Sequence, residues 1–186
     1  MRIRRVVFAA VIMVSAIISA EEQVCSPVQT VADFIVALKS GNREVAVKLF
    51  APCEGEAREH VEKWLDKAMP FFASGKVESK AENVCFIDGD VSISPIRQWR
   101  PGNPDIYEIE LTGLVFVGGK WLLLPDLDKF NSPVNSELLP SERNKRFENL
   151  WHLFCDFKRI HKDKVRKARE EQAIRRMRDV QGEQAK

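Results

Sequence analysis

The stretch of sequence that decides the fold is IYEIELTGLVFVGGKWLLL, residues 106–124. Apolar and polar side chains alternate in its first half, which is typical of a β-strand with one buried face. Gly118-Gly119 favours a two-residue turn, because both glycines tolerate the positive φ that tight hairpins need. The stretch therefore predicts two antiparallel strands, at residues 106–117 and 120–124.

The same alternation extends upstream of this hairpin. Residues 76–87 read as a strand, Asp88-Gly89 as a hairpin turn, and residues 90–99 as the returning strand. Pro95 lies within the returning strand and lacks a backbone donor, so it implies a bulge or a sheet edge. The segment from 76 to 124 is thus predicted to be an antiparallel meander.

Three helices are predicted before the meander. Ser26-Pro27-Val28-Gln29 is a capping box with proline at the first helical position, and Gly41 ends that helix. Asn42 can cap a short second helix. A third helix begins at about Glu56, and Pro70 is expected to kink or end it.

A long helix is predicted after the meander. Residues 131–140 form a proline-containing linker, and Ser141 caps a helix that is first amphipathic and then almost wholly charged. The chain therefore divides into an α+β domain at residues 21–130, the linker, and a C-terminal helix at residues 141–186.

The first 20 residues are typical of a secretory signal peptide. Basic residues at Arg2, Arg4 and Arg5 precede an uncharged run from Val6 to Ile18, and small residues follow. This run has 13 residues, whereas a spanning helix needs roughly 20. We expect an exported protein, periplasmic or secreted, without a transmembrane span; an uncleaved N-terminal anchor is the alternative.

Charge is distributed unevenly along the chain. Residues 156–186 contain 11 Lys or Arg and 6 Asp or Glu, whereas residues 21–155 contain 15 and 21. A basic tail thus follows an acidic body. Export argues against a nucleic-acid partner, so the tail is expected to be a solvated helix or to contact an acidic surface.

All four cysteines lie after the predicted signal peptide, and an even number in an exported chain favours two disulfides. Cys25 and Cys53 flank the predicted pair of antiparallel helices, so we expect a Cys25–Cys53 bridge. Elimination leaves Cys85–Cys155. Four free thiols are the alternative.

Two short motifs carry a family resemblance. Gly41-Asn42 follows the first helix and Leu49-Phe50 ends the second, while Gly119 precedes Trp121 in the last hairpin. In this arrangement the chain from Pro27 to Asp128 resembles the NTF2-like (cystatin-like, SnoaL-type) superfamily. The resemblance implies a curved antiparallel sheet whose concave face and N-terminal helices enclose an apolar pocket. The superfamily contains isomerases and dehydratases as well as domains without catalytic activity, so the fold alone does not decide the function.

Candidate residues for such a pocket are few. Tyr107 could donate a hydrogen bond to a ligand, with His60 or Asp33 as a general base. Pocket-lining candidates are aromatic: Trp64, Trp99, Tyr107 and Trp121. Packing in the core or a place on the surface is the simpler account of each of them. No phosphate-binding loop or nucleophile motif occurs, Asp126 and Asp128 do not form a recognisable calcium loop, and we predict neither a metal nor a cofactor.

Three functions remain open on this basis. The first is a non-catalytic exported module that binds a small apolar ligand or a protein partner. The second is a small enzyme of the isomerase or dehydratase kind that uses the same pocket. The third is a structural protein that forms a homodimer through its long last helix.

Overall fold

The computed structural model describes residues 26–125 and 141–184. The signal peptide, Cys25, the predicted linker and the aspartates at 126 and 128 lie outside the described residues. The helices and strands are α2 (Pro27–Ser40), α3 (Arg43–Lys48), α4 (Gly55–Ala73), β1 (Glu78–Ala81), β2 (Phe86–Asp88), β3 (Val91–Trp99), β4 (Tyr107–Val117), β5 (Lys120–Leu123) and α5 (Ser141–Gln184).

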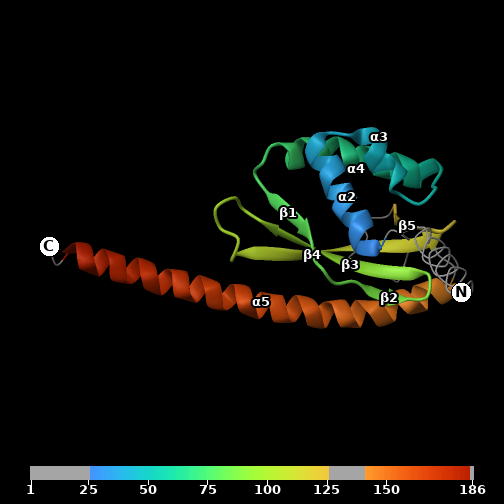
Figure 1. Ribbon diagram of the computed structural model, residues 1–186. Helices are drawn as coiled ribbons and strands as arrows, with labels where there is room; N and C mark the ends of the chain where they lie inside the picture. The colour runs from blue at the N-terminus through green and yellow to red at the C-terminus, as the bar shows by residue number, and fades with distance from the viewer. Residues whose placement is uncertain (1–25, 126–140, 185–186) are drawn as a thin grey trace, which may run out of the picture.

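The predicted α+β class is confirmed. The strands form one curved antiparallel sheet in the order β1-β3-β4-β5, and β2 also pairs with β3. Helices α2, α3 and α4 lie over one face of the sheet, and α5 runs along the other face (Figure 1). The sheet is therefore the middle of three layers.

The N-terminal helices begin and end where their capping residues predict. The Ser26 hydroxyl accepts a hydrogen bond from the Gln29 amide, and Gly41 ends α2 in the left-handed conformation at φ 68°. Asn42 caps α3 through the Val45 amide. Pro70 lies inside α4 and does not end it; of the two predicted effects, a kink or an end, the end comes three residues later, at Ala73. A proline in the last turn removes few hydrogen bonds, and the helix tolerates it there.

Two strands replace the single strand predicted at residues 76–87. Both β1 and β2 pair with β3, and the chain between them leaves the sheet opposite Pro95. Ala81 pairs with Ile96 and Phe86 with Ile93, so four residues on one side face two on the other. Because Pro95 has no N–H, a regular ladder cannot continue past it, and the partner strand bulges out instead.

The two hairpin turns differ in type. Val117 pairs with Lys120, and Gly118 and Gly119 both have positive φ, as a type I′ turn requires. Asp88 pairs with Val91, so the central residues of the first hairpin are Gly89 and Asp90, one position beyond the prediction. Only Gly89 has positive φ there, which is the pattern of a type II′ turn.

The sheet separates two hydrophobic cores. The core on the helix side joins α2 and α4 to strand residues such as Ile96, Leu114 and Leu123. The core on the α5 side joins Phe147, Leu150 and Phe154 to the opposite face of the same strands. Successive residues of β4 therefore belong to different cores, since side chains alternate along a strand.

Hydroxyl groups are buried on the helix side of the sheet. Ser92, Ser94 and Thr112 are almost fully inaccessible. No group among the described residues lies within hydrogen-bond distance of the Ser92 or Ser94 Oγ atom. A buried hydroxyl without a partner loses its hydration without compensation and destabilises the fold.

We therefore expect Ser94→Ala to raise the free energy of unfolding by about 1 kcal/mol, because it removes an unpaired buried hydroxyl. Urea denaturation measures the change. Thr30→Val is the matched control: the Thr30 hydroxyl is equally buried but donates to the Trp121 carbonyl, 3.2 Å away, so its loss should be destabilising. A Ser94→Ala variant as destabilised as Thr30→Val would contradict the expectation.

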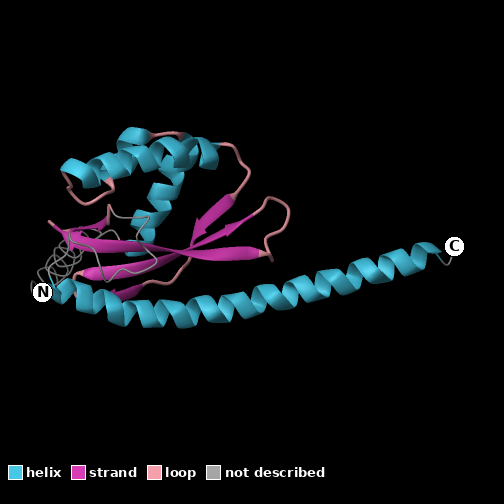
Figure 2. Ribbon diagram, turned by 180° about the vertical axis from the view of Figure 1, so that it is seen from behind, coloured by secondary structure: helices cyan, strands magenta, loops and turns pink. Residues whose placement is uncertain are grey.

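Helix α5 extends well beyond the domain. Its start is held by Arg143 and Arg146, which both donate to the Asp90 carboxylate at 2.5 and 2.8 Å. Gln172 donates the last side-chain hydrogen bond from α5 to the sheet domain among the described residues, to the Asn103 side chain. The remaining turns project past the end of the sheet as a free arm, residues 173–184 (Figure 2).

Candidate functional site

The first half of β4 is an edge of the sheet that no described strand covers. Strand β5 pairs only with Leu114–Val117, so Tyr107–Thr112 has no partner strand on that side among the described residues. The Gly113 carbonyl accepts from the Leu124 amide and thus points toward β5. Backbone groups alternate in direction along a strand, so those of Ile109 and Leu111 point outward at the same edge. Within residues 26–125 and 141–184, these donors and acceptors form an unpaired edge.

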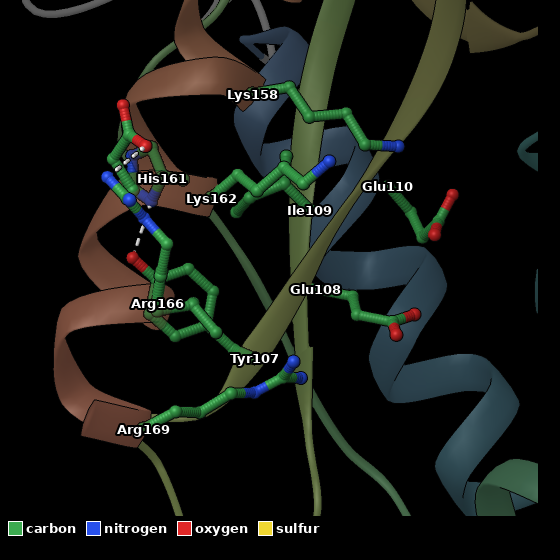
Figure 3. Close-up of a pocket in the computed structure, with 11 residues that line it drawn as sticks. Tyr107, Glu108, Ile109, Glu110, Lys158, His161, Lys162, Arg166 and Arg169 are labelled. Atoms are coloured by element: carbon green, nitrogen blue, oxygen red, sulfur yellow. Dashed lines mark hydrogen bonds and ion pairs between the residues drawn. The ribbon is translucent and has the colours of Figure 1, made fainter.

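A groove of about 700 Å³ lies between this edge and α5. Its floor includes the buried side chains of Ile109, His161 and Val165. The walls are charged, as Figure 3 shows. Helix α5 contributes Lys158, Lys162, Asp163, Arg166 and Arg169, and β4 contributes Glu108 and Glu110.

Tyr107 and His161 are paired at the end of the groove. The Tyr107 hydroxyl and His161 Nδ1 lie 2.7 Å apart. The Arg97 guanidinium stacks on the Tyr107 ring at 4.2 Å and forms an ion pair with Glu82. The His161 ring also packs on Phe157, with ring centroids 4.3 Å apart. One polar network thus joins β1–β2, β3, β4 and α5.

Burial keeps this pair neutral. Burial lowers the pKa of His161, the charges of Lys164 and Arg97 lower it further, and Glu82 opposes them. Burial also raises the pKa of Tyr107. Neutral His161 accepts at Nδ1 from the Tyr107 hydroxyl when its own proton is on Nε2, and donates from Nδ1 in the other tautomer. Each group therefore satisfies the other, and the pair holds α5 against the sheet.

The lowered pKa of His161 predicts a pH-dependent stability. The unfolded chain binds a proton near the ordinary value of 6.5, and the folded chain only at lower pH. The contribution of His161 is therefore complete above about pH 6.5 and is lost as the pH falls through the lowered pKa. Urea unfolding between pH 7.5 and 5 should show this loss for the natural chain. His161→Gln should remove the part of this pH dependence of the free energy of unfolding that His161 causes. His152 is exposed, so His152→Gln should leave the pH dependence unchanged.

The predicted catalytic residues are not brought together. Tyr107 packs in the core on the α5 side of the sheet. Asp33 lies on α2, where it accepts a hydrogen bond from Gln29, and His60 lies on α4; both helices cover the opposite face. A base and a donor must reach one ligand position within about 3 Å. The predicted combination of Tyr107 with His60 or Asp33 does not meet this condition.

The residues predicted to line the pocket also lie on different sides of the sheet or at its end. Trp64 stacks on Phe34, and Trp121 packs against Phe116, all on the helix side of the sheet. Both tryptophans belong to the first core. Trp99 instead lines a second cavity of about 420 Å³ at the end of the sheet, which it shares with Tyr107.

The described cysteines carry free thiols. Cys53, Cys85 and Cys155 are all unbridged in the structure, so the predicted Cys85–Cys155 bridge is not formed. The other predicted bridge, Cys25–Cys53, involves Cys25, which lies outside the described residues. For the second bridge the reason is the rotation of α5. Phe154 turns into the core, so its neighbour Cys155 is exposed. Burial raises the pKa values of the Cys53 and Cys85 thiols.

His161 is the site residue that the sequence did not reveal. It follows Phe157 by four residues, which is one helical turn along the buried stripe, and that spacing was the available signal. Its partner on β4 depends on how α5 docks on the sheet, and no local pattern encodes this. Within residues 26–125 and 141–184, no three His, Cys, Asp or Glu side chains are grouped to hold a metal.

Comparison with known proteins gives no relative for this chain: no protein-family model, curated protein or solved structure matches it. Among the described helices, none is long and apolar enough to cross a membrane.

Proposed function

We propose that this protein is an exported, non-catalytic binding module whose ligand is an extended segment of a protein partner, taken up at the open edge of β4. The observation that carries the proposal is the unpaired edge at Tyr107–Thr112 beside a groove of about 700 Å³. An extended peptide can add to such an edge as a further strand, with main-chain hydrogen bonds supplying affinity.

The shape of the groove supports a peptide. Exposed sheet edges are usually covered or shortened, because they pair with other chains. Here α5 walls the edge on one side, and the groove between them is lined by residues 107–110 of β4 (Figure 3). The apolar floor at Ile109 and Val165 would bury side chains of the added strand.

The arrangement of polar groups in the site supports binding rather than catalysis. The Tyr107 hydroxyl is already paired with His161. Asp33 and His60 belong to the other side of the sheet. Export rests on the N-terminal segment alone, and N-terminal sequencing of the protein from its host should start near Glu21. The NTF2-like relationship stays a proposal, supported by the curved sheet with helices over one face.

Selection from an unbiased library of displayed peptides tests the proposed function. Peptides enriched on the full-length chain should slow hydrogen exchange at the amides of Ile109 and Leu111, since these donors would become bonded. Leu111→Pro is the blocking variant: it removes one outward donor at an edge position where proline is tolerated, and circular dichroism checks that it folds.

Two results would overturn the proposal. One is that no peptide is enriched above an unrelated control protein. The other is that the enriched peptides protect amides only in α2 or α4, on the far side of the sheet. Because exchange is measured on the natural chain, the result stands even if Leu111→Pro fails to fold.

A further inference from the structure

Four cationic side chains form one stripe along the groove. Lys158, Lys162, Arg166 and Arg169 are spaced by four, four and three residues, so they lie on one face of α5. Arg166 pairs with Asp163 at 3.2 Å. No carboxylate of the described residues is within ion-pair distance of the other three. This basic stripe is therefore largely uncompensated by the protein itself.

The two glutamates that line the groove, Glu108 and Glu110, lie on the opposite side of β4 from the basic stripe. Glu108 and Glu110 alternate with Tyr107 and Ile109 along β4, so their side chains lie on the helix side of the sheet. Figure 3 shows both carboxylates on the far side of the strand from α5. The open edge thus separates a basic surface from an acidic one.

The spacing of side chains along an added strand is close to the spacing of the cations along α5. A strand advances about 6.7 Å for every two residues, which is the repeat of side chains on one face. A helix advances about 6 Å for every four residues, which is the repeat of the basic stripe. Helix α5 and β4 run alongside one another (Figure 3), so every second side chain of an added strand would meet one cation over about three turns.

We infer that the groove selects an extended segment with a carboxylate at every second position, facing α5, and neutral or basic residues between them, facing Glu108 and Glu110. This inference rests on the proposed function and adds the chemistry of the partner. Cross-strand neighbours of opposite charge stabilise pairing, and like charges oppose it. Backbone pairing would fix the register, and the charges would determine which sequence is accepted.

A second copy of this chain is a poorer occupant. Pairing two β4 edges would bring Glu108 and Glu110 of one copy beside the same residues of the other. Two basic stripes would also approach one another. Like charges directly opposite in a sheet are destabilising, so charge favours a foreign segment over self-pairing.

Binding of designed peptides tests the inference. The probes are labelled octapeptides in which threonine alternates with glutamate, glutamine or lysine. The full-length chain should bind the glutamate peptide about tenfold more tightly than the glutamine peptide, as expected for about three partly exposed ion pairs. The lysine peptide should bind most weakly. The triple variant K158E/K162E/R169E should reverse this order.

The matched control carries the same change in charge away from the groove. K63E/K67E/K120E alters three exposed lysines on α4 and the last hairpin and should keep the natural order. Equal binding of the glutamate and glutamine peptides, with protection at Ile109 and Leu111, would overturn the charge inference and leave the proposed function standing. No protection with any peptide would count against the proposed function itself.

Two further outcomes would identify a different occupant. A single-stranded oligonucleotide that binds more tightly than the glutamate peptide, and is lost in the triple groove variant, would overturn the peptide assignment. Sedimentation showing a dimer that protects the same amides would instead assign the edge to a second copy.

Discussion

Replacing Phe154 by alanine is expected to lower the free energy of unfolding by about 3–5 kcal/mol. The Phe154 side chain is 1% exposed in the core between the sheet and α5. Removing a fully buried ring loses its transfer free energy and leaves a cavity that the sheet cannot collapse to fill. Denaturation with urea measures the loss. Since domains are stable by about 5–15 kcal/mol, most of the chain should stay folded at 25 °C.

The adjacent residue supplies the control. Leu153 is 52% exposed, so Leu153→Ala should change the free energy by less than about 0.5 kcal/mol. Phe154→Ala should also weaken peptide binding, because α5 forms one wall of the groove. An equal loss of stability in both variants would show that α5 does not dock as described.

Leu65→Ala should destabilise the protein by about 2–5 kcal/mol through the other core. Leu65 lies on α4 and is fully buried against the helix side of the sheet. Thermal and urea unfolding give the change, and Val36→Ala on the exposed face of α2 is the matched control, with little expected effect.

The two core variants should differ in binding. Leu65 lies across the sheet from the groove, so Leu65→Ala should keep the natural affinity for the glutamate peptide under conditions where the protein is folded. Phe154→Ala, compared at similar stability, should bind the glutamate peptide more weakly than the natural chain does. Parallel losses of affinity would mean that the sheet transmits changes between its two faces.

Local patterns in the sequence predicted the helices and turns well. The Ser26 and Asn42 caps, Gly41 and the Gly118-Gly119 turn act within a few residues, and the structure contains each of them. Pro95 predicted a bulge or a sheet edge, and the bulge lies opposite it, but the division of residues 76–87 into β1 and β2 was missed because Pro95 lies on the partner strand. Residues 76–87 contain no signal for it.

The candidate site was less predictable than the fold. Tyr107 was identified from its place on an amphipathic strand, but its partner could not be, because the Tyr107–His161 pair joins residues 54 positions apart. The unpaired edge depends on the length of β5 relative to β4. Periodicity predicts where strands begin and end within a few residues, and it does not say which edge a following helix leaves open.

The free end of α5 bears on the speed of association. Residues 173–184 project past the sheet, and Arg175, Arg176 and Arg178 lie on this arm. At about 1.5 Å per residue the arm reaches roughly 18 Å into solvent, which exceeds the Debye length of about 8 Å at physiological ionic strength. An anionic segment would therefore be attracted before it reaches the groove and guided along the helix toward it. Added salt should then slow the arrival of such a segment much more than it hastens its departure.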